Sequence, residues 1–261
     1  MLDLIEKKLL KNKLKNNQLT IGSWVMMNSI TNIEVMALGG FEWLVIDLEH
    51  TSIDLQTTEN LIRTIQANDM SALVRVDKNE EVIIKKVLDM GADGIVVPMV
   101  CSKEDALQAV NYAKYPPKGK RGVGLYRASG YGTKFEEYKK WVDEELIIIA
   151  QIEHIDAVNN IDEILKVDGI DGTIIGPYDL SGSMGYPGEF ERVNVKKAIQ
   201  TVIEKCKEHN TPSGFHVVDT NPEKIQSKID IGCTFLAYGI DYLFLRDSVM
   251  SGMNKLKKNL R

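Results

Sequence analysis

The sequence predicts an α/β protein whose fold is a (β/α)8 TIM barrel. Three observations favour this fold class: eight short aliphatic runs recur along the chain, helical patterns separate nearly all of them, and 261 residues is an ordinary length for one such barrel. An open doubly wound sheet is the alternative, because a count of strands does not prove that the sheet closes. We expect residues 1–261 to form a single barrel domain.

Each predicted strand is a continuous apolar run, which is typical of parallel strands that are buried on both faces. A chain of this length buries about three quarters of the surface that it exposes when unfolded, so a full core is expected. In chain order, the strands are predicted at residues 19–24, 43–47, 72–76, 94–99, 146–153, 172–176, 212–218 and 234–238.

Capping residues mark where two of the intervening helices begin. Thr31 with Glu34, and Ser102 with Asp105, fit the capping box, in which each side chain bonds a free backbone N–H of the other residue. A final helix is predicted over 241–258, where apolar residues recur at helical spacing, so this face must be buried somewhere. Those apolar residues are Tyr242, Leu245, Val249, Met253 and Leu256.

Residues 115–133 form an irregular stretch that is rich in Pro, Gly, Tyr and Arg. The stretch is too long for a plain connection between elements, which favours a functional loop. Its glycines and basic residues at 118–124 are compatible with phosphate binding. The segment does not follow a strand, however, so it does not by itself predict a phosphate site.

Composition and charge exclude several classes of protein. The chain is 44% hydrophobic and 26% charged, which excludes disordered and low-complexity proteins. Its net charge of −5 argues against bulk nucleic-acid binding, which usually needs a basic face. No apolar stretch approaches the roughly 20 residues of a membrane span, and the N-terminus is too charged for a secretory signal. Three widely spaced cysteines suit a reducing environment, so we expect a cytoplasmic protein.

Polar residues gather at the carboxyl ends of the predicted strands, where the active site of a TIM barrel lies. This pattern is the main indication that the protein is an enzyme. The residues placed there are Trp24, Asp47, Glu49, His50, Arg75, Gln151, Glu153, Asp179 and His216.

Glu153 and Asp179 predict a site for a divalent cation. Glu153 ends a buried apolar run, and a carboxylate there costs several kcal/mol unless it meets a cation or a metal. Asp179 follows a Gly-Pro turn at the next strand end. Two carboxylates at adjacent strand ends favour Mg²⁺ or Mn²⁺ with open positions for water and substrate. The alternatives are an ion pair for Glu153 and a helix cap for Asp179.

Arg75 and His50 are candidates for binding and proton transfer. The planar guanidinium of Arg75 could hold a substrate carboxylate, although a salt bridge to Asp47 or Glu49 is equally compatible with its position. His50 could carry a proton near neutral pH, and a structural histidine is the alternative. Asp89 lies late on a predicted helix, where exposure to solvent is the default expectation.

Several segments together resemble the HpcH/HpaI family of class II, metal-dependent pyruvate aldolases. The resemblance covers nearly the whole chain, and the family fold is a (β/α)8 barrel, in agreement with the strand count. The segments that carry it are GGFEWLVIDLEH at 39–50, ALVRV at 72–76, KKVLDMGADGIVVPM at 85–99, YPPKGKRGVG at 115–124, QIE at 151–153 and IIGPYDLSGSMGYPGE.

The resemblance implies roles for the residues that bind metal and pyruvate. Glu153 and Asp179 match the two protein ligands of a divalent metal, which could be Mg²⁺, Mn²⁺ or Co²⁺. Arg75 and Gln151 match residues around the pyruvyl group, and Gly176 lies where the backbone contacts its carboxylate. The implied reaction is the reversible cleavage of a 4-hydroxy-2-oxo acid into pyruvate and an aldehyde through a pyruvate enolate, without an organic cofactor.

The resemblance also implies which residue acts as the catalytic base and how the subunits assemble. His50 matches the catalytic histidine of the family, and Asp89 matches the acid paired with it, which replaces the surface interpretation of Asp89. Trp24 matches an aromatic residue of the substrate pocket. The family commonly forms a hexamer, a trimer of dimers that exchange C-terminal helices, so a homo-oligomer is expected.

His216 departs from the family pattern, because the position is usually aliphatic in the aldolases that this chain resembles. We expect it to contact the aldehyde end of the substrate. Two alternative functions remain: a citrate-lyase-like enzyme acting on an acyl-CoA, for which 114–121 is the candidate basic path, and a non-catalytic metabolite-binding barrel. Retention of His50 argues against the second, since binding alone requires no base.

Overall fold

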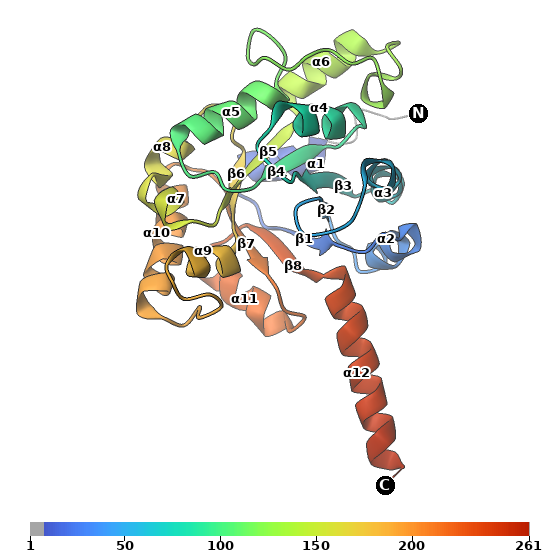
Figure 1. The fold of residues 1–261 in the computed structure, drawn as a ribbon, viewed down its shortest axis with the longest axis vertical. Coiled ribbons are helices and arrows are strands. Elements are labelled where there is room, and N and C mark those ends of the chain that lie inside the picture. Colours follow the sequence, from blue (N-terminus) through green and yellow to red (C-terminus); the bar gives the residue numbers. More distant parts are fainter. Residues whose placement is uncertain (1–7, 261) are drawn as a thin grey trace.

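The computed structural model describes residues 8–260, in which eight parallel strands close into a barrel surrounded by helices (Figure 1). The sheet closes into a barrel because its first strand forms hydrogen bonds with both the second and the eighth. The predicted barrel is therefore confirmed and the open sheet is excluded. The strands are β1 (Thr20–Val25), β2 (Trp43–Asp47), β3 (Ser71–Arg75), β4 (Gly94–Val97), β5 (Ile147–Ile152), β6 (Gly172–Ile175), β7 (Ser213–Val217) and β8 (Phe235–Ile240).

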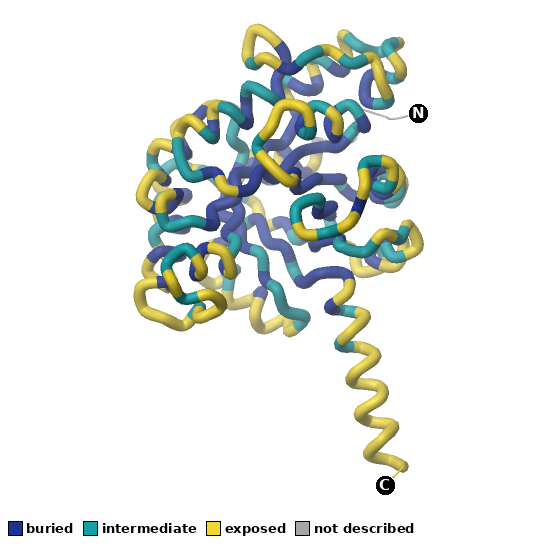
Figure 2. Tube along the Cα trace, viewed as in Figure 1, coloured by how far each residue is buried: buried dark blue, intermediate teal, exposed yellow. Residues whose placement is uncertain are grey.

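The helices pack around the barrel, and buried residues concentrate in the strands and on the inward helix faces (Figure 2). All eight predicted strands are present, and no strand end differs from its prediction by more than two residues. The helices are α1 (Lys8–Lys15), α2 (Ile30–Ala37), α3 (Leu55–Ala67), α4 (Glu81–Asp89), α5 (Lys103–Ala113), α6 (Phe135–Glu144), α7 (Ile155–Asn159), α8 (Ile161–Leu165), α9 (Pro177–Ser183), α10 (Val193–Glu208), α11 (Pro222–Asp230) and α12 (Asp241–Asn259), with a 3-10 turn at Arg127–Ser129.

The barrel interior is filled by large apolar side chains, and α1 contributes to it with Leu10 and Leu14. Trp43 and Phe235 stack inside the barrel, with ring centroids 4.2 Å apart. Gly22 of β1 is needed beside them, because a Cβ there would lie 2.1 Å from the Trp43 ring. This packing fills the interior of the barrel and leaves the polar strand ends to form a site at its other end.

One predicted helix start is wrong and the other is confirmed. α2 begins two residues earlier than expected, because Ser29 and not Thr31 accepts the capping bond, from the backbone N–H of Asn32. At α5, Ser102 accepts from the backbone N–H of Asp105 as predicted. Ser29 and Thr31 are both residues that can cap a helix, and the chain path here places Ser29 at the cap.

The predicted C-terminal helix is present as α12, which extends away from the barrel (Figure 1) and is exposed along nearly its whole length (Figure 2). Its apolar residues Leu245, Val249 and Leu256 are each at least half exposed. The apolar face is therefore not covered by the described part of the same chain. Within residues 8–260, no helix combines the length and the apolar character needed to span a membrane.

Candidate active site

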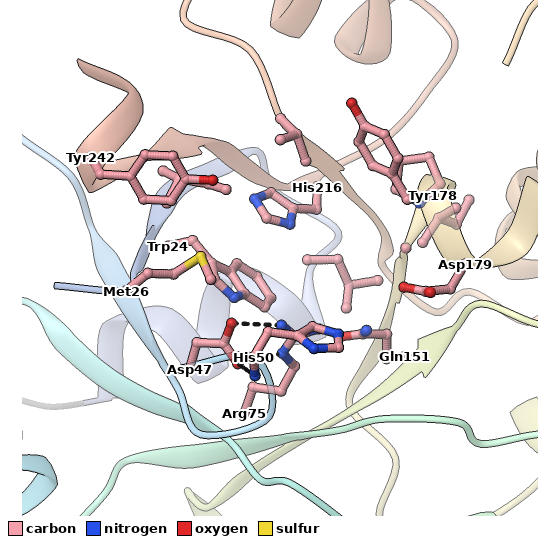
Figure 3. A pocket seen from close by; sticks show the side chains of 16 residues that line it. Trp24, Met26, Asp47, His50, Arg75, Gln151, Tyr178, Asp179, His216 and Tyr242 are labelled. Carbon is pink, nitrogen blue, oxygen red and sulfur yellow. Dashed lines mark hydrogen bonds and ion pairs between the residues drawn. The ribbon is translucent and has the colours of Figure 1, made fainter. Parts of the chain in front are cut away.

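A pocket of about 310 Å³ opens at the carboxyl ends of the strands. Figure 3 shows Trp24 and Tyr242 on one side of it, Gln151 and Asp179 on the other, and His216 between them. His50 and Arg75 lie at the same end of the barrel. The structure thus brings together side chains from six different strand ends that the sequence analysis had selected separately. The lining also includes Met26, Asp47, Gly176, Tyr178 and Val218.

Arg75 is held by two acids at the end of β2, Asp47 as its last residue and Glu49 just beyond it. Its Nε and Nη2 atoms donate to the two oxygens of Asp47 at 2.9 and 2.6 Å, and its Nη1 atom lies 2.9 Å from Glu49 Oε2. The salt bridge considered from the sequence is therefore present. It does not remove Arg75 from the pocket, since the guanidinium still lines it. The paired acids fix the orientation of a planar donor that could face a bound anion.

The turn that carries His50 is fixed by the same aspartate. Asp47 Oδ1 accepts from the backbone N–H groups of Glu49 and His50, at 3.0 and 3.3 Å. The His50 side chain remains 58% exposed, and its Nε2 atom lies 3.9 Å from Glu49 Oε2. Burial raises the pKa of Glu49 to about 7, although the charge of Arg75 lowers it in part. The imidazole of His50 is thus placed at the pocket with its ring open to a substrate or a water.

Glu153 lies beneath the opposite side of the pocket and is almost fully buried. Its Oε1 atom accepts from the backbone N–H of Met99 at 2.8 Å, and its Oε2 atom accepts from Gln151 Nε2. Met99 has a φ of 51°, an unfavourable region for its side chain, and this backbone directs the N–H at Glu153. At Gly176, a Cβ would lie 2.9 Å from Glu153 Oε2, so only glycine leaves room for the carboxylate.

Asp179 lies in the first turn of α9, next to Glu153. The N-cap of that helix is Gly176 and no side chain caps it, so the helix-cap alternative for Asp179 is not realised. Among residues 8–260, no hydrogen bond engages the Asp179 carboxylate. Burial raises the pKa of Glu153, and the nearby negative charge of Asp179 raises it further. Two carboxylates therefore lie close together at adjacent strand ends without an ion pair of their own.

The donor set fits a hard divalent cation. Both residues offer carboxylate oxygens, which Mg²⁺ and Mn²⁺ prefer. Within residues 8–260, no three His, Cys, Asp or Glu side chains form a ready-made metal cluster. The protein would then supply two ligands only, which leaves the remaining coordination positions to water and substrate. An enzyme needs such open positions, whereas a structural metal site has none.

His216 reaches the pocket, as expected from its position late in β7. Its ring stacks on Trp24 with centroids 4.3 Å apart and an angle of 17° between the planes. Its Nε2 atom lies 3.3 Å from the carbonyl oxygen of Gly239, so this nitrogen is the donor. Burial, together with the nearby charge of Arg75, lowers the pKa of His216 to about 4. The imidazole is therefore neutral near pH 7, and Nδ1 carries a lone pair.

Asp89 does not join His50 within the described chain. It ends α4, and its carboxylate pairs at 2.6 Å with Arg121, whose side chain is fully buried between Tyr115 and Tyr138. The default expectation of a solvent-exposed Asp89 is wrong, because its side chain is only 17% exposed. The buried cation of the irregular loop holds the acid in place.

Two of the basic residues at 114–121, the candidate path for the phosphates of a coenzyme, are buried. Lys114 is buried and donates to the carbonyl oxygen of Val142, and Arg121 is buried against Asp89. Lys118 lies 3.4 Å from Asp143, and Lys120 is exposed. With two of its four basic residues buried and a third paired, the segment offers one cation that is free within residues 8–260, and not the row that the phosphates of a coenzyme would require.

Sequence reasoning missed three features of the site. Tyr178 and Tyr242 line the pocket. The only sequence signal for either of them is that Tyr178 directly precedes Asp179. The backbone N–H of Met99 holds Glu153, and no side-chain pattern indicates a backbone donor.

Comparison with known proteins gives consistent matches over this fold and site. The model of the HpcH/HpaI aldolase/citrate lyase family matches residues 20–247. A 2-keto-3-deoxy-L-rhamnonate aldolase of Escherichia coli is 34% identical over 241 residues, covering 92% of this chain and 89% of the relative. A hydroxypyruvate/pyruvate aldolase of Roseobacter denitrificans is 34% identical over 250 residues, which cover 95% of this chain and 96% of the relative. The crystal structure of a family member from Burkholderia cenocepacia superposes with a TM-score of 0.91 at 26% identity, covering 96% of this chain and 99% of that one.

Proposed function

The chain belongs to the HpcH/HpaI aldolase/citrate lyase family and is a carbon–carbon lyase, and we propose that it reversibly cleaves a 4-hydroxy-2-oxo acid into pyruvate and an aldehyde. The observation that carries this proposal is the buried carboxylate of Glu153 next to Asp179, directly behind a pocket that Asp179, Arg75 and His50 line. We also propose a cytoplasmic location, since all three cysteines are free thiols. Screening pyruvate against a panel of aldehydes, with Mg²⁺, Mn²⁺ and Co²⁺, tests the reaction.

Glu153 and Asp179 would hold a divalent metal, because they are paired oxygen donors without another cation. When bound, such a metal acts as a Lewis acid toward the 2-oxo acid. The hydrogen bonds from Met99 and Gln151 fix the Glu153 carboxylate before anything binds. This support reduces the reorganisation that binding would otherwise require.

Arg75, Gln151 and Gly176 would orient the pyruvyl group. Arg75 is preorganised by Asp47 and Glu49, so its charge is fixed in position when negative charge develops on the departing pyruvate enolate. Gln151 lies between the metal-binding side and Arg75 (Figure 3), and its Oε1 atom has no partner among the described residues. The absence of a side chain at Gly176 leaves its backbone open to the pocket.

His50 would remove the proton of the C4 hydroxyl as the C3–C4 bond breaks, directly or through one water. Its exposed ring and its turn anchored to Asp47 suit a base that must meet an entering substrate. In the synthetic direction it would remove a methyl proton of pyruvate. Asp89 is the family position paired with this base, but here its carboxylate faces Arg121, so we propose that it supports the loop at 115–133.

The acyl-CoA alternative loses its candidate path, because Lys114 and Arg121 are buried. The non-catalytic alternative does not explain why His50 lies in the pocket with its ring exposed. Pyruvate aldol chemistry gives a role to Asp179, Arg75, Gln151 and His50, which all line the pocket. A metal-dependent exchange of pyruvate methyl protons separates the three functions, since neither alternative produces it.

His216→Leu should shift the preference of the enzyme from hydroxylated toward plain aliphatic aldehydes. Nε2 donates to Gly239, so Nδ1 offers the pocket an acceptor that suits a substrate hydroxyl. We expect the ratio of kcat/KM values to move by about 1–3 kcal/mol, the usual cost of an unmade hydrogen bond. Because the pKa of His216 lies near 4, this ratio should stay constant above about pH 5.5. Competition between a hydroxylated and an aliphatic aldehyde measures this ratio of kcat/KM values.

Pyruvate proton exchange is the control for this variant, because the metal-binding side, Arg75 and His50 are unaltered. An unchanged aldehyde ratio would mean that the bond to Gly239 is the whole role of His216. A collapse of exchange would place His216 in the chemistry of pyruvate itself.

The chain should assemble into an oligomer larger than a dimer, with a hexamer favoured. The exposed apolar residues of α12 need a partner surface, and the chain that carries them does not provide one within residues 8–260. Leu245→Asp with Val249→Asp should therefore lower the mass measured by light scattering. Ser251→Asp, on the opposite side of the same helix, is the matched control. A monomeric parent protein would contradict the assignment.

A further inference from the structure

A second and larger pocket, of about 480 Å³, lies outside the barrel beside the end of β7. It is formed where α10 and α11 both pack against β7 (Figure 1). Lys224, Ser227 and Lys228 recur at the spacing of one face of α11, and Lys196, Ile199 and Gln200 do the same on α10. Two helix faces therefore converge on one cavity whose volume falls in the ordinary range for small-molecule sites.

The cavity combines an apolar base with a cationic rim. Phe215 and Val217 point outward from β7, opposite to His216, and form its base with Ile199 and Ile231. Three lysines, Lys196, Lys224 and Lys228, and two acids, Glu191 and Asp219, are the charged residues of the lining. A surplus of positive charge here contrasts with the net charge of −5 for the chain.

Both acids of the lining are already engaged, whereas two of the lysines are not. Glu191 forms an ion pair with Lys196 at 2.5 Å, and Asp219 Oδ1 accepts from the backbone N–H of Asn221 at 2.8 Å. Among residues 8–260, no carboxylate lies within ion-pair distance of Lys224 or Lys228. Neither of these two ammonium groups therefore forms an ion pair, and Glu191, whose charge acts on both of them, is already paired with Lys196.

Lys228 is the cation placed deepest against the apolar base. Its Nζ atom lies 4.4 Å from the centroid of the Phe215 ring, a cation–π distance. Burial lowers the pKa of Lys228, which shows that its surroundings disfavour the charge. An entering anion would give this half-buried ammonium a direct ion pair, which no carboxylate of residues 8–260 provides.

We propose that this pocket is a binding site for a small organic anion with an apolar body, whose anionic group contacts Lys224 and Lys228 and whose body packs on Phe215. The apolar base provides burial for the body, and the two lysines provide charge for the head group. The site is separate from that of pyruvate, although the two pockets share a wall at Pro177, Tyr178, His216 and Val218.

The probe for this site is 4-phenylbutyrate, titrated into the full-length protein by isothermal calorimetry in the presence of saturating pyruvate. We expect saturable binding that weakens about a hundredfold when Lys224→Gln and Lys228→Gln are combined, since each lost charged contact weakens binding about tenfold. Lys228→Arg should retain binding, because it keeps the charge and confirms that the site can be altered without unfolding. Lys197→Gln, at the exposed neighbour of Lys196, is the matched control and should bind as the parent does.

Three results would overturn the proposal. Equal affinity for the uncharged 4-phenylbutyramide would show that the lysines do not recognise an anion. Equal weakening in Lys197→Gln would show that only the general surface charge matters. Loss of binding when pyruvate is added would place the probe in the active-site pocket. None of these results depends on whether the protein is a lyase, which proton exchange of pyruvate reports separately.

Discussion

Glu153→Ala is expected to abolish both lyase activity and divalent-metal binding while the barrel remains folded. Glu153 supplies the buried oxygen of the proposed pair, and Asp179 alone offers a single exposed carboxylate on the first turn of a helix. Removing a ligand removes the Lewis-acid stabilisation of the reaction. Folding should not suffer, because the substitution also removes a carboxylate that burial penalises in the metal-free protein. Calorimetric titration with Mn²⁺ and a thermal melt measure the two effects.

Asp179→Ala should give the same loss of metal binding, since the two carboxylates act together. Asp156→Ala is the matched control, because Asp156 is an exposed acid only three residues from Glu153 and pairs with His154 instead. The control should bind Mn²⁺ as the parent does. Metal affinity that survives in both Glu153→Ala and Asp179→Ala would remove these residues from the metal site.

His50→Ala should lower the aldol rate by about a hundredfold or more, the usual scale for a positioned acid–base group. Binding of pyruvate should survive, because Arg75 and the Glu153–Asp179 pair are unaltered. The two expectations predict a fall in kcat with little change in the KM for pyruvate. Steady-state kinetics of cleavage and synthesis, together with a titration of pyruvate, separate these parameters.

His209→Ala provides the control for this variant, since His209 contacts Asp162 at 2.9 Å and does not line the pocket. Its kinetics should match those of the parent. If His50→Ala changed only the apparent affinity for pyruvate, His50 would be a binding residue and the proposed proton transfer would be wrong.

The barrel was predictable because each strand is buried on both faces and therefore reads as a continuous apolar run. Residues 43–47 show this best, since β2 has the predicted limits and every one of its residues is buried. The gathering of site residues was predictable for a related reason. Polar residues that end or directly follow buried strands, such as Asp47 and Glu153, lie at the same end of a parallel barrel.

The features that sequence reasoning missed depend on contacts between distant segments. Asp89 and Arg121 are 32 residues apart, and nothing in either local pattern shows that a buried guanidinium holds the acid. The Met99 N–H reaches Glu153 through a backbone conformation that side-chain patterns do not encode. Conversely, the apolar spacing of 241–258 predicted a helix with a face to bury, but not the surface that covers it.

The exchange of pyruvate methyl protons with deuterated water, followed by NMR, tests the central proposal most directly. Exchange requires the pyruvate-binding groups, the base and the metal at once, and it does not require the natural aldehyde. We predict exchange in the presence of Mg²⁺, Mn²⁺ or Co²⁺, its loss when a chelator removes the metal, and its return when the metal is restored. Exchange that persists at full rate in the chelator, or that no divalent metal supports, would contradict the assignment of this protein as a metal-dependent pyruvate aldolase.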